Sequence, residues 1–272
     1  MDIVMSSPPT HDLRASLIDP LSLSLAHSVP HYPDEDTKLR ASSLEVRRGG
    51  NGANSLEVLQ QLIVRPGDGR RLHLVACLPR KDSLATQQVM RSFGRVATPV
   101  SFRHCVYRDE ATEAASSYII RSDRTGSRTL VNYNPLAEMT VAEFEIIARD
   151  FPPEGKSWWH FEGRIPDTTL ECIRILRSVL PGCKISVEVE KPGREGLREL
   201  AAEVDVVFYS KAWTEDNGYD SAMACLTTEP RGQASLSLCP WGAGGAYAIS
   251  HVSGDQIHCP VKQQPEQITV VE

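Results

Sequence analysis

Short apolar runs alternate with amphipathic stretches along most of this chain. The runs over residues 72–78 and 204–209 are typical of strands buried on both faces, and residues 158–161 and 184–189 are predicted as further strands. Stretches with helical periodicity lie between and beside them, over residues 56–64, 83–93, 141–150, 168–180 and 194–203. Because strands that alternate with helices of this length form βαβ units, we predict an α/β fold with a mostly parallel sheet.

Other segments carry weaker patterns. Residues 1–30 show no clear periodicity, and the alternating run Leu21–Leu25 fits a short strand or no element. Residues 37–46 alternate as in a strand, and residues 96–107 are expected to form one extended segment. Residues 116–120 and 128–132 flank a polar turn, which predicts a hairpin.

Length, charge and hydropathy argue against some classes of partner. Its 272 residues suffice for one large α/β domain, which we expect to span residues 1–272. The net charge is −6 and the basic residues are scattered among acidic ones, which argues against nucleic acid as a partner. No apolar run approaches the ~20 residues that span a bilayer, and residues 1–9 lack a signal-peptide pattern. We therefore expect a cytoplasmic protein without a membrane partner.

Cysteine and histidine usage gives no metal motif. The seven cysteines stand far apart without Cys-x-x-Cys spacing, which is typical of free thiols in a reducing compartment. The eight histidines are dispersed and include no His-Glu-x-x-His motif, so we predict no metal site from these residues.

A glycine-rich stretch, Arg47 to Ser55, lies between a predicted strand and a predicted helix. Such a junction presents backbone N–H groups at a helix N-terminus, which suits a polar or anionic ligand. The amides of Asn51 and Asn54 both donate and accept hydrogen bonds, as sugar hydroxyls require. Taken alone, the stretch also fits a tight turn in any α/β protein.

Polar residues follow several predicted strands at the point where each strand ends. They occupy residues 50–51, 162–164, 188–191, 210–211 and 241–245. Ligands of parallel sheets bind at the carboxyl ends of the strands, so this placement predicts a site there. Turns follow strands in every α/β fold, so the placement alone is a weak signal.

Specific motifs occur within this pattern. Gly-Gly-Asn-x-x-Asn-Ser covers residues 49–55, and Glu-Val-Glu-Lys-Pro covers residues 188–192. Supporting stretches cover residues 32–36, 126–131, 159–164 and 205–211. In this order and spacing, from about residue 30 onward, the chain resembles the ribokinase-like carbohydrate kinases, and within them the ketohexokinases (fructokinases).

The resemblance implies a three-layer, Rossmann-like ribokinase fold with a small β lid built from residues 37–47 and 116–133. It also implies transfer of the γ-phosphoryl group of ATP, with Mg²⁺, to the hydroxyl of a fructose- or ribose-like sugar. Lids of this kind pair two subunits in ketohexokinases, so we expect a homodimer.

The resemblance further implies site residues. Gly50, Asn51 and Asn54 are expected to hold the sugar. Arg128 matches a lid arginine near the ligand phosphates, although it fits a solvated hairpin charge equally well. Glu162 matches a position near the sugar and magnesium, although a local pair with Arg164 is an equal alternative.

The expected nucleotide contacts lie later in the chain. Ser210 stands near the contacts that the family makes, although a turn residue at a strand end is a slightly better interpretation. The loop expected to cradle ADP consists of Trp241, Gly242, Ala243, Gly244 and Gly245, since glycines let backbone N–H groups approach phosphates.

The sequence departs from the family in two places. The first-strand Asp that grips the sugar is not evident, and Asp19 beside Pro20 is the nearest candidate. The Gly-Ala-Gly-Asp motif, which supplies the catalytic base and anion hole, is absent, and Gly242–Gly245 lacks its Asp. We therefore expect a chain that stops just before its catalytic motif and lacks the C-terminal helices, with no identifiable catalytic residue and little kinase activity.

Three hypotheses remain from the sequence. The first is a carbohydrate kinase or an incomplete copy of one, with a nucleoside as another possible acceptor. The second is a non-catalytic sugar- or nucleotide-binding paralogue that acts as an interaction protein. The third is a generic α/β interaction domain, which the two specific motifs disfavour.

Overall fold

The computed structural model describes residues 14–18, 22–62, 71–94, 99–154 and 156–261. The chain divides into two compact units, residues 1–157 and residues 158–272. Each unit is described separately below. No helix in the described ranges is long and apolar enough to cross a membrane.

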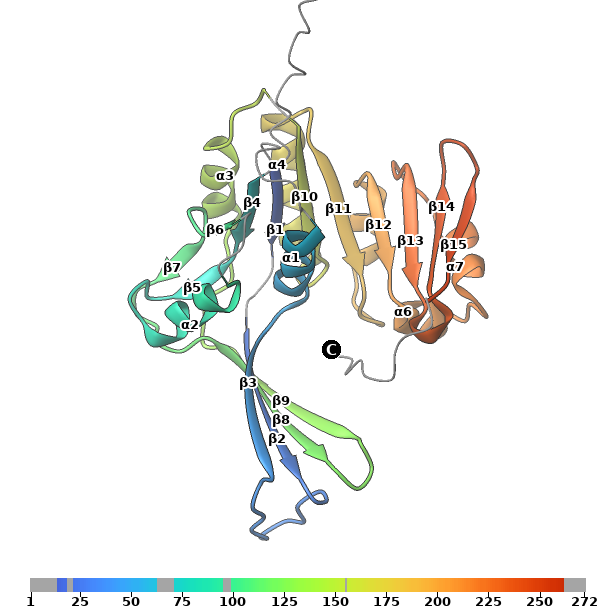
Figure 1. The fold of residues 1–272 in the computed structure, drawn as a ribbon. Helices are drawn as coiled ribbons and strands as arrows, with labels where there is room; N and C mark the ends of the chain where they lie inside the picture. The colour runs from blue at the N-terminus through green and yellow to red at the C-terminus, as the bar shows by residue number, and fades with distance from the viewer. Residues whose placement is uncertain (1–13, 19–21, 63–70, 95–98, 155, 262–272) are drawn as a thin grey trace, which may run out of the picture. The chain divides into compact units, whose positions relative to one another are not determined.

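The first unit contains a parallel sheet with flanking helices (Figure 1). Its central strand β4 (Arg71–Val75) pairs in parallel with β1 (Arg14–Ile18) and with β6 (Val100–Ser101). A separate parallel pair joins β5 (Cys77–Pro79) to β7 (Val106–Arg108). The helices of this unit are α1 (Asn51–Leu62), α2 (Leu84–Ser92) and α3 (Val141–Arg149).

Local signals explain where these helices begin. Ser83 caps α2 by accepting a hydrogen bond from the backbone N–H of Thr86. Thr140 and Glu143 form a reciprocal capping box at the start of α3. The predicted helices over residues 83–93 and 141–150 are thus confirmed to within a residue or two.

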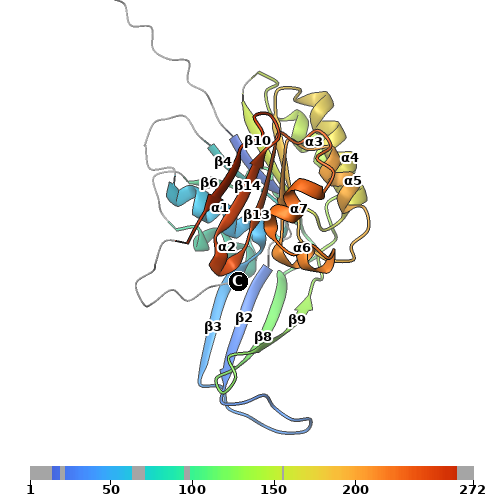
Figure 2. The ribbon, with the colours of Figure 1, turned by 90° about the vertical axis from the view of Figure 1, so that its right-hand side faces the viewer.

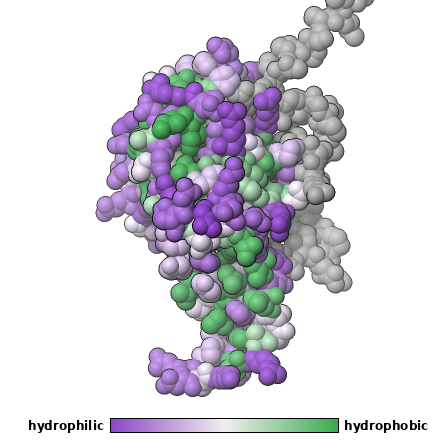
Figure 3. All heavy atoms as spheres, turned by 90° about the vertical axis from the view of Figure 1, so that its left-hand side faces the viewer, coloured by the Kyte–Doolittle hydropathy of each residue, from purple (hydrophilic) through white to green (hydrophobic). Residues whose placement is uncertain are grey.

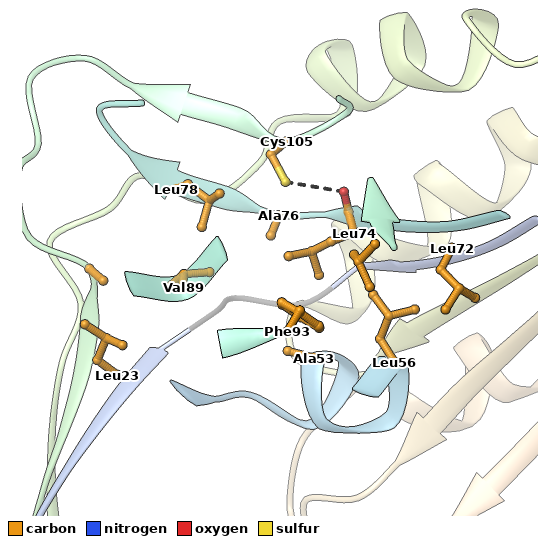
Figure 4. Packing of buried hydrophobic residues seen from close by; sticks show 12 residues of the cluster. Leu23, Ala53, Leu56, Leu72, Leu74, Ala76, Leu78, Val89, Phe93 and Cys105 are labelled. Carbon is orange, nitrogen blue, oxygen red and sulfur yellow. Dashed lines mark hydrogen bonds between the residues drawn. The ribbon is translucent and has the colours of Figure 1, made fainter. Parts of the chain in front are cut away.

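The core of the first unit lies between α1, α2 and the strands β4 and β5 (Figure 4). Leu56, Leu74 and Leu78 are fully buried in it. Cys105 belongs to the same cluster, and its Sγ donates to the carbonyl oxygen of Leu74 at 3.3 Å. Leu23, from the lid described next, also joins the cluster.

A second sheet in the first unit contains the segments predicted to form a lid, and this sheet is called the lid below. Its strand order is β3 (Ser43–Gly49), β2 (Ser22–Val29), β8 (Ala115–Ser122) and β9 (Arg128–Tyr133). Strands β8 and β9 pair as an antiparallel hairpin, so the hairpin prediction is confirmed.

Four predictions of local structure need correction in the first unit. Residues 1–30 contain β1 and β2, although the sequence suggested at most one short strand there, over the run Leu21–Leu25. The lid strand predicted from residue 37 begins at Ser43, because a turn closes between Thr37 and Asp34. Residues 96–107 include two short strands instead of one extended segment, and 72–78 divides between β4 and β5 at Ala76.

The second unit contains six sheet strands in the order β15-β14-β13-β12-β11-β10 (Figure 1), and Figure 2 shows β13 and β14 from the front. The strands β10 to β13 are parallel neighbours, and β14 and β15 continue the sheet as antiparallel strands. Their bounds are β10 (Ser157–Glu162), β11 (Lys184–Val189), β12 (Val206–Tyr209), β13 (Leu236–Pro240), β14 (Ala246–Ser250) and β15 (Gln256–Cys259).

Helices connect these strands. They are α4 (Pro166–Val179), α5 (Leu197–Ala202), α6 (Lys211–Asp216) and α7 (Ala222–Thr228). Helix α5 packs on α4 and β11, and α7 packs on β13 and β14. Trp159, Ile185 and Val187 are fully buried in this unit. The alternation of strands and helices predicted for this half of the chain is confirmed.

Candidate functional site

The predicted sugar loop forms the junction between β3 and α1. Gly50 has a φ of +105°, a conformation that favours glycine, and it turns the chain from the strand into the helix. The backbone N–H of Asn54 donates to the carbonyl oxygen of Gly50 at 3.0 Å, which closes the first turn of α1. The motif thus places Gly50, Asn51 and Asn54 within one turn of the chain.

Arg48 holds this junction together from the end of β3. Its Nη1 donates to Oδ1 of Asn54 at 3.2 Å, and its Nη2 donates to Oε2 of Glu57. Its Nε donates to Oγ of Ser92 at 2.9 Å, while the guanidinium carbon lies 4.2 Å from the ring centroid of Phe93. The Arg48 side chain is only 3% exposed, so its charge is stabilised by these partners and not by water.

Arg128 lies away from this junction within the same unit. It is the first residue of β9 and pairs with Arg121, whereas the sugar loop follows the opposite end of the lid sheet. Because Ala115 and Arg121 are six residues apart on β8, this separation is about 20 Å at ~3.3 Å per residue. The structure therefore does not bring Arg128 together with Asn51 and Asn54 of its own unit.

Glu162 lies in the second unit, at the carboxyl end of β10, opposite Glu188 of β11. Burial raises the pKa of the nearby Glu190 carboxyl, and the negative charges of Glu162 and Glu188 raise it further. Gly163 follows directly, and a Cβ atom there would lie 2.4 Å from the carbonyl oxygen of Glu188. This close approach explains the glycine in the Glu-Gly-Arg stretch.

Ser210 serves the local structure at the end of β12. Its Oγ accepts a hydrogen bond from the backbone N–H of Trp213 at 2.9 Å and so caps α6. The same hydroxyl donates to the carbonyl oxygen of Glu190 at 2.6 Å. Its single proton is therefore used within the protein, which supports the turn interpretation without testing a nucleotide contact.

The predicted ADP loop, Trp241 to Gly245, is the connection between β13 and β14. Residues Gly242–Gly244 form a single 3₁₀ turn, and the N–H of Trp241 donates to the carbonyl oxygen of Gly245 at 2.7 Å. Gly245 has a φ of +89°, and a Cβ atom there would lie 2.2 Å from the carbonyl oxygen of Cys259. Packing against β15 thus accounts for Gly245, whereas Gly242 and Ala243 are exposed.

Ser210 and the loop that begins at Trp241 lie close together in the second unit. Lys211, which follows Ser210, places its Nζ 5.3 Å from the ring centroid of Trp241. Asp19, the candidate first-strand acid, lies outside the described residues, although β1 ends just before it at Ile18. Within the described ranges no group of three or more His, Cys, Asp or Glu residues is arranged for a metal ion.

Sequence reasoning missed two polar residues that organise these regions. Arg48 stood inside the glycine-rich stretch but received no role. His160 lies on β10, with Nδ1 at 2.8 Å from Oγ of Ser186 and Nε2 at 3.0 Å from Oε1 of Glu188. The available signal was spacing, because Ser186 and Glu188 are two residues apart and thus face the same side of β11.

Comparison with known proteins gives a consistent relationship. No protein-family model matches the sequence. Ketohexokinase of Mus musculus is 27% identical over 256 residues, which cover 90% of this chain and 80% of that protein.

Solved structures show the same fold. The ribokinase of Thermotoga maritima has a TM-score of 0.68 at 14% identity, covering 92% of this chain and 78% of its own. The Arabidopsis thaliana ribokinase in complex with ribose and ATP has a TM-score of 0.69 at 12% identity, with the same coverage, 92% and 78%. The chain has the fold of the ribokinase-like kinases, and its sequence resembles that of ketohexokinase.

Proposed function

We propose that the chain binds a fructose- or ribose-like sugar together with MgATP, and that these 272 residues transfer the γ-phosphoryl group slowly or not at all. The observation that carries the first part is the sugar loop, in which Gly50 turns the chain and Arg48 holds Asn54. The Arabidopsis ribokinase was solved with ribose and ATP, and we extend that pair of ligands to this chain.

In this proposal each unit contributes one ligand contact region. Gly50, Asn51 and Asn54 bind sugar hydroxyls, because an Asn amide can both donate to and accept from them. The exposed backbone of Gly242 and Ala243 offers the approach that nucleotide phosphates need, beside Trp241 and Ser210. Arg128 is assigned to the ligand phosphates only by resemblance.

The residues present fit a magnesium ion carried by ATP. Mg²⁺ is usually held by substrate phosphates plus one or two carboxylates. The raised pKa of Glu190, to which the charges of Glu162 and Glu188 contribute, indicates that negative charge accumulates at this sheet edge. A cation would relieve that repulsion, so we propose that Glu162 is the carboxylate nearest the metal. The Mg²⁺ ion would in turn neutralise charge on the phosphates.

The expectation of slow turnover rests on the missing Gly-Ala-Gly-Asp motif. Phosphoryl transfer depends on positioning and on charge stabilisation. Loss of a general base costs ~10²–10⁴-fold in rate, and the anion hole would be lost with it. The second candidate function is a non-catalytic sugar- or nucleotide-binding protein that acts through interactions.

The lid supports a homodimer as part of either function. One row of facing residues crosses all four lid strands, namely Val46, Leu25, Tyr118 and Val131. Val46, Tyr118 and Val131 are 44%, 45% and 62% exposed, and Figure 3 shows the apolar colour gathered over the lid. An apolar sheet face in water favours a partner, and we propose a second copy of this chain.

The redox state of the cysteines indicates the cellular compartment. All seven are free, including six that are buried. Since disulfides are rare in the reducing cytosol, we propose a cytoplasmic location.

Two measurements test the proposal. Thermal-shift titrations with fructose, ribose, adenosine and MgATP are expected to show stabilisation by a sugar and by the nucleotide. No shift with any of them would overturn ligand binding and favour a generic interaction domain. A coupled ADP-release assay with fructose or ribose is expected to show turnover at least ~100-fold below that of a ketohexokinase run in parallel. Robust turnover would overturn only the proposal that phosphoryl transfer is slow, and would leave the proposal of ligand binding intact.

A further inference from the structure

The contact between Arg48 and Asn54 determines which end of the Asn54 amide faces a ligand. A guanidinium carries only N–H donors, so the Asn54 atom that faces Nη1 must be the acceptor Oδ1. The Nδ2 group then points away from Arg48, and no hydrogen bond among the described residues uses it. Asn54 is only partly buried, so a ligand can reach this group.

We infer that Arg48 is a positioning residue that fixes the amide of Asn54, so that Asn54 recognises an oxygen of the sugar as a hydrogen-bond donor. This inference rests on the proposed function, in which Asn54 contacts the sugar. It adds a requirement on the sugar: the oxygen that faces Asn54 must accept a hydrogen bond. If that oxygen is a hydroxyl, its proton must be donated to another group.

The surroundings of Arg48 make its position rigid. Its guanidinium is fixed from three directions, by Glu57 on α1, by Ser92 at the end of α2 and by the ring of Phe93. A planar fork can satisfy such partners simultaneously, whereas the ammonium of lysine is a flexible point charge. Because Arg48 belongs to β3, the amide of Asn54 is also tied to a strand of the lid.

The decisive variant is Asn54→Asp, which keeps the shape and the acceptor but removes the donor. Its carboxylate still accepts from Arg48, in a charge-assisted bond, so the melting temperature should be maintained or raised. Affinity for fructose or ribose, measured by calorimetry, should fall about tenfold or more, because the sugar oxygen loses its donor. Affinity for MgATP should stay within about twofold, which a general loss of structure would not allow.

Arg48→Lys tests the positioning role. Lysine retains the charge but cannot hold Asn54, Ser92 and the Phe93 ring at once, so sugar affinity should fall about tenfold with nucleotide affinity unchanged. Arg47→Lys is the matched control, since Arg47 is the adjacent residue, points to the other side of β3 and pairs with Glu45 at 2.9 Å. It should bind sugar as the unaltered chain does.

The outcomes separate the inference from the function beneath it. Sugar affinity of Asn54→Asp within about twofold of the unaltered chain overturns the donor role, and undiminished affinity in Arg48→Lys overturns the positioning role. If Arg48→Lys fails to fold, Asn54→Asp still decides. Full affinity in Asn54→Ala overturns the sugar contact of Asn54, whereas no sugar binding by the unaltered chain overturns the proposed function itself.

Discussion

His160 and Glu188 join two neighbouring strands, with 3.0 Å between Nε2 of the imidazole and Oε1 of the carboxylate. The other ring nitrogen lies 2.8 Å from Oγ of Ser186, which also receives the indole N–H of Trp158 at 2.8 Å. With the proton of His160 on Nε2, each group donates to the next, from Trp158 to Ser186, His160 and Glu188. Serine hydrolases use a similar order of groups, but Ser186 is fully buried and cannot meet a substrate.

This chain of hydrogen bonds should contribute to stability. We expect His160→Phe to lower the free energy of unfolding by about 1–3 kcal/mol, because it removes partners of Ser186 and Glu188 while retaining a ring beside Phe208. Trp158→Phe, which removes one donor, should cost about 1 kcal/mol. Urea unfolding measures both values. Equal losses in the two variants would contradict a central role for His160.

Acid should weaken the first unit through Glu143. Arg108 donates Nη1 and Nη2 to the two carboxylate oxygens at 2.5 and 3.1 Å. Hydrogen bonding from Arg108, aided by Thr140, lowers the pKa of Glu143 from 4.5 to about 2. A depressed pKa in the folded state stabilises the fold above the unfolded value, so this contribution is lost as pH falls from 4.5 to about 2.

Glu143→Gln tests this pH dependence. The variant should be less stable than the unaltered chain near neutral pH, by about 1–3 kcal/mol, and the difference should shrink as the pH approaches the pKa of Glu143. Glu145→Gln on the same helix is the control, because its ion pair with Arg149 is exposed and contributes little. A difference independent of pH would contradict the assignment.

The fold was largely predictable from sequence, and the exceptions have physical reasons. Strand β11 was predicted with its observed bounds because Ile185, Val187 and Val189 alternate with polar residues, as in a strand. Strand β1, with Arg14 and Ser16, has no such run. Strand β2 alternates clearly, but its partner β8 lies far along the chain, so its place in a sheet was not evident.

The candidate site was predictable only where it is local. Gly50 and Asn54 lie in one turn, so their motif identified them together. Arg48 could not be assigned, because its partners Ser92 and Phe93 come from a helix more than 40 residues later. Contacts between distant side chains depend on how elements pack, which a single sequence does not specify.

Thiol reactivity offers a direct check of the packing. Cys259 is exposed on β15, whereas the other six cysteines are buried. Burial raises the pKa of Cys105 and of Cys172 to about 12, which suppresses the reactive thiolate. Iodoacetamide should therefore modify Cys259 alone in the native chain and all seven in denaturant, as read by mass spectrometry. The native Cys259→Ser variant should remain unmodified. Rapid labelling of Cys105 would contradict its burial in the core of the first unit.

The last prediction concerns the lid. Its two faces differ, because Leu44, Val46 and Val131 belong to the apolar face, whereas Leu130 lies on the side that carries Glu45. If a second copy packs on the apolar face, a charge introduced on that face must become desolvated on association. Val131→Glu should therefore weaken the dimer by about 100-fold or more, the cost of burying an unpaired carboxylate.

Light scattering after size-exclusion chromatography measures this effect across a range of protein concentrations. Leu130→Glu is the matched control, since it introduces the same charge one residue away, at a side chain that is 46% exposed on the opposite face. It should leave the dimer intact. Equal dissociation by both variants would indicate general damage to β9, and a monomeric unaltered chain would exclude pairing through the lid, because the exposed apolar row would then be tolerated in water.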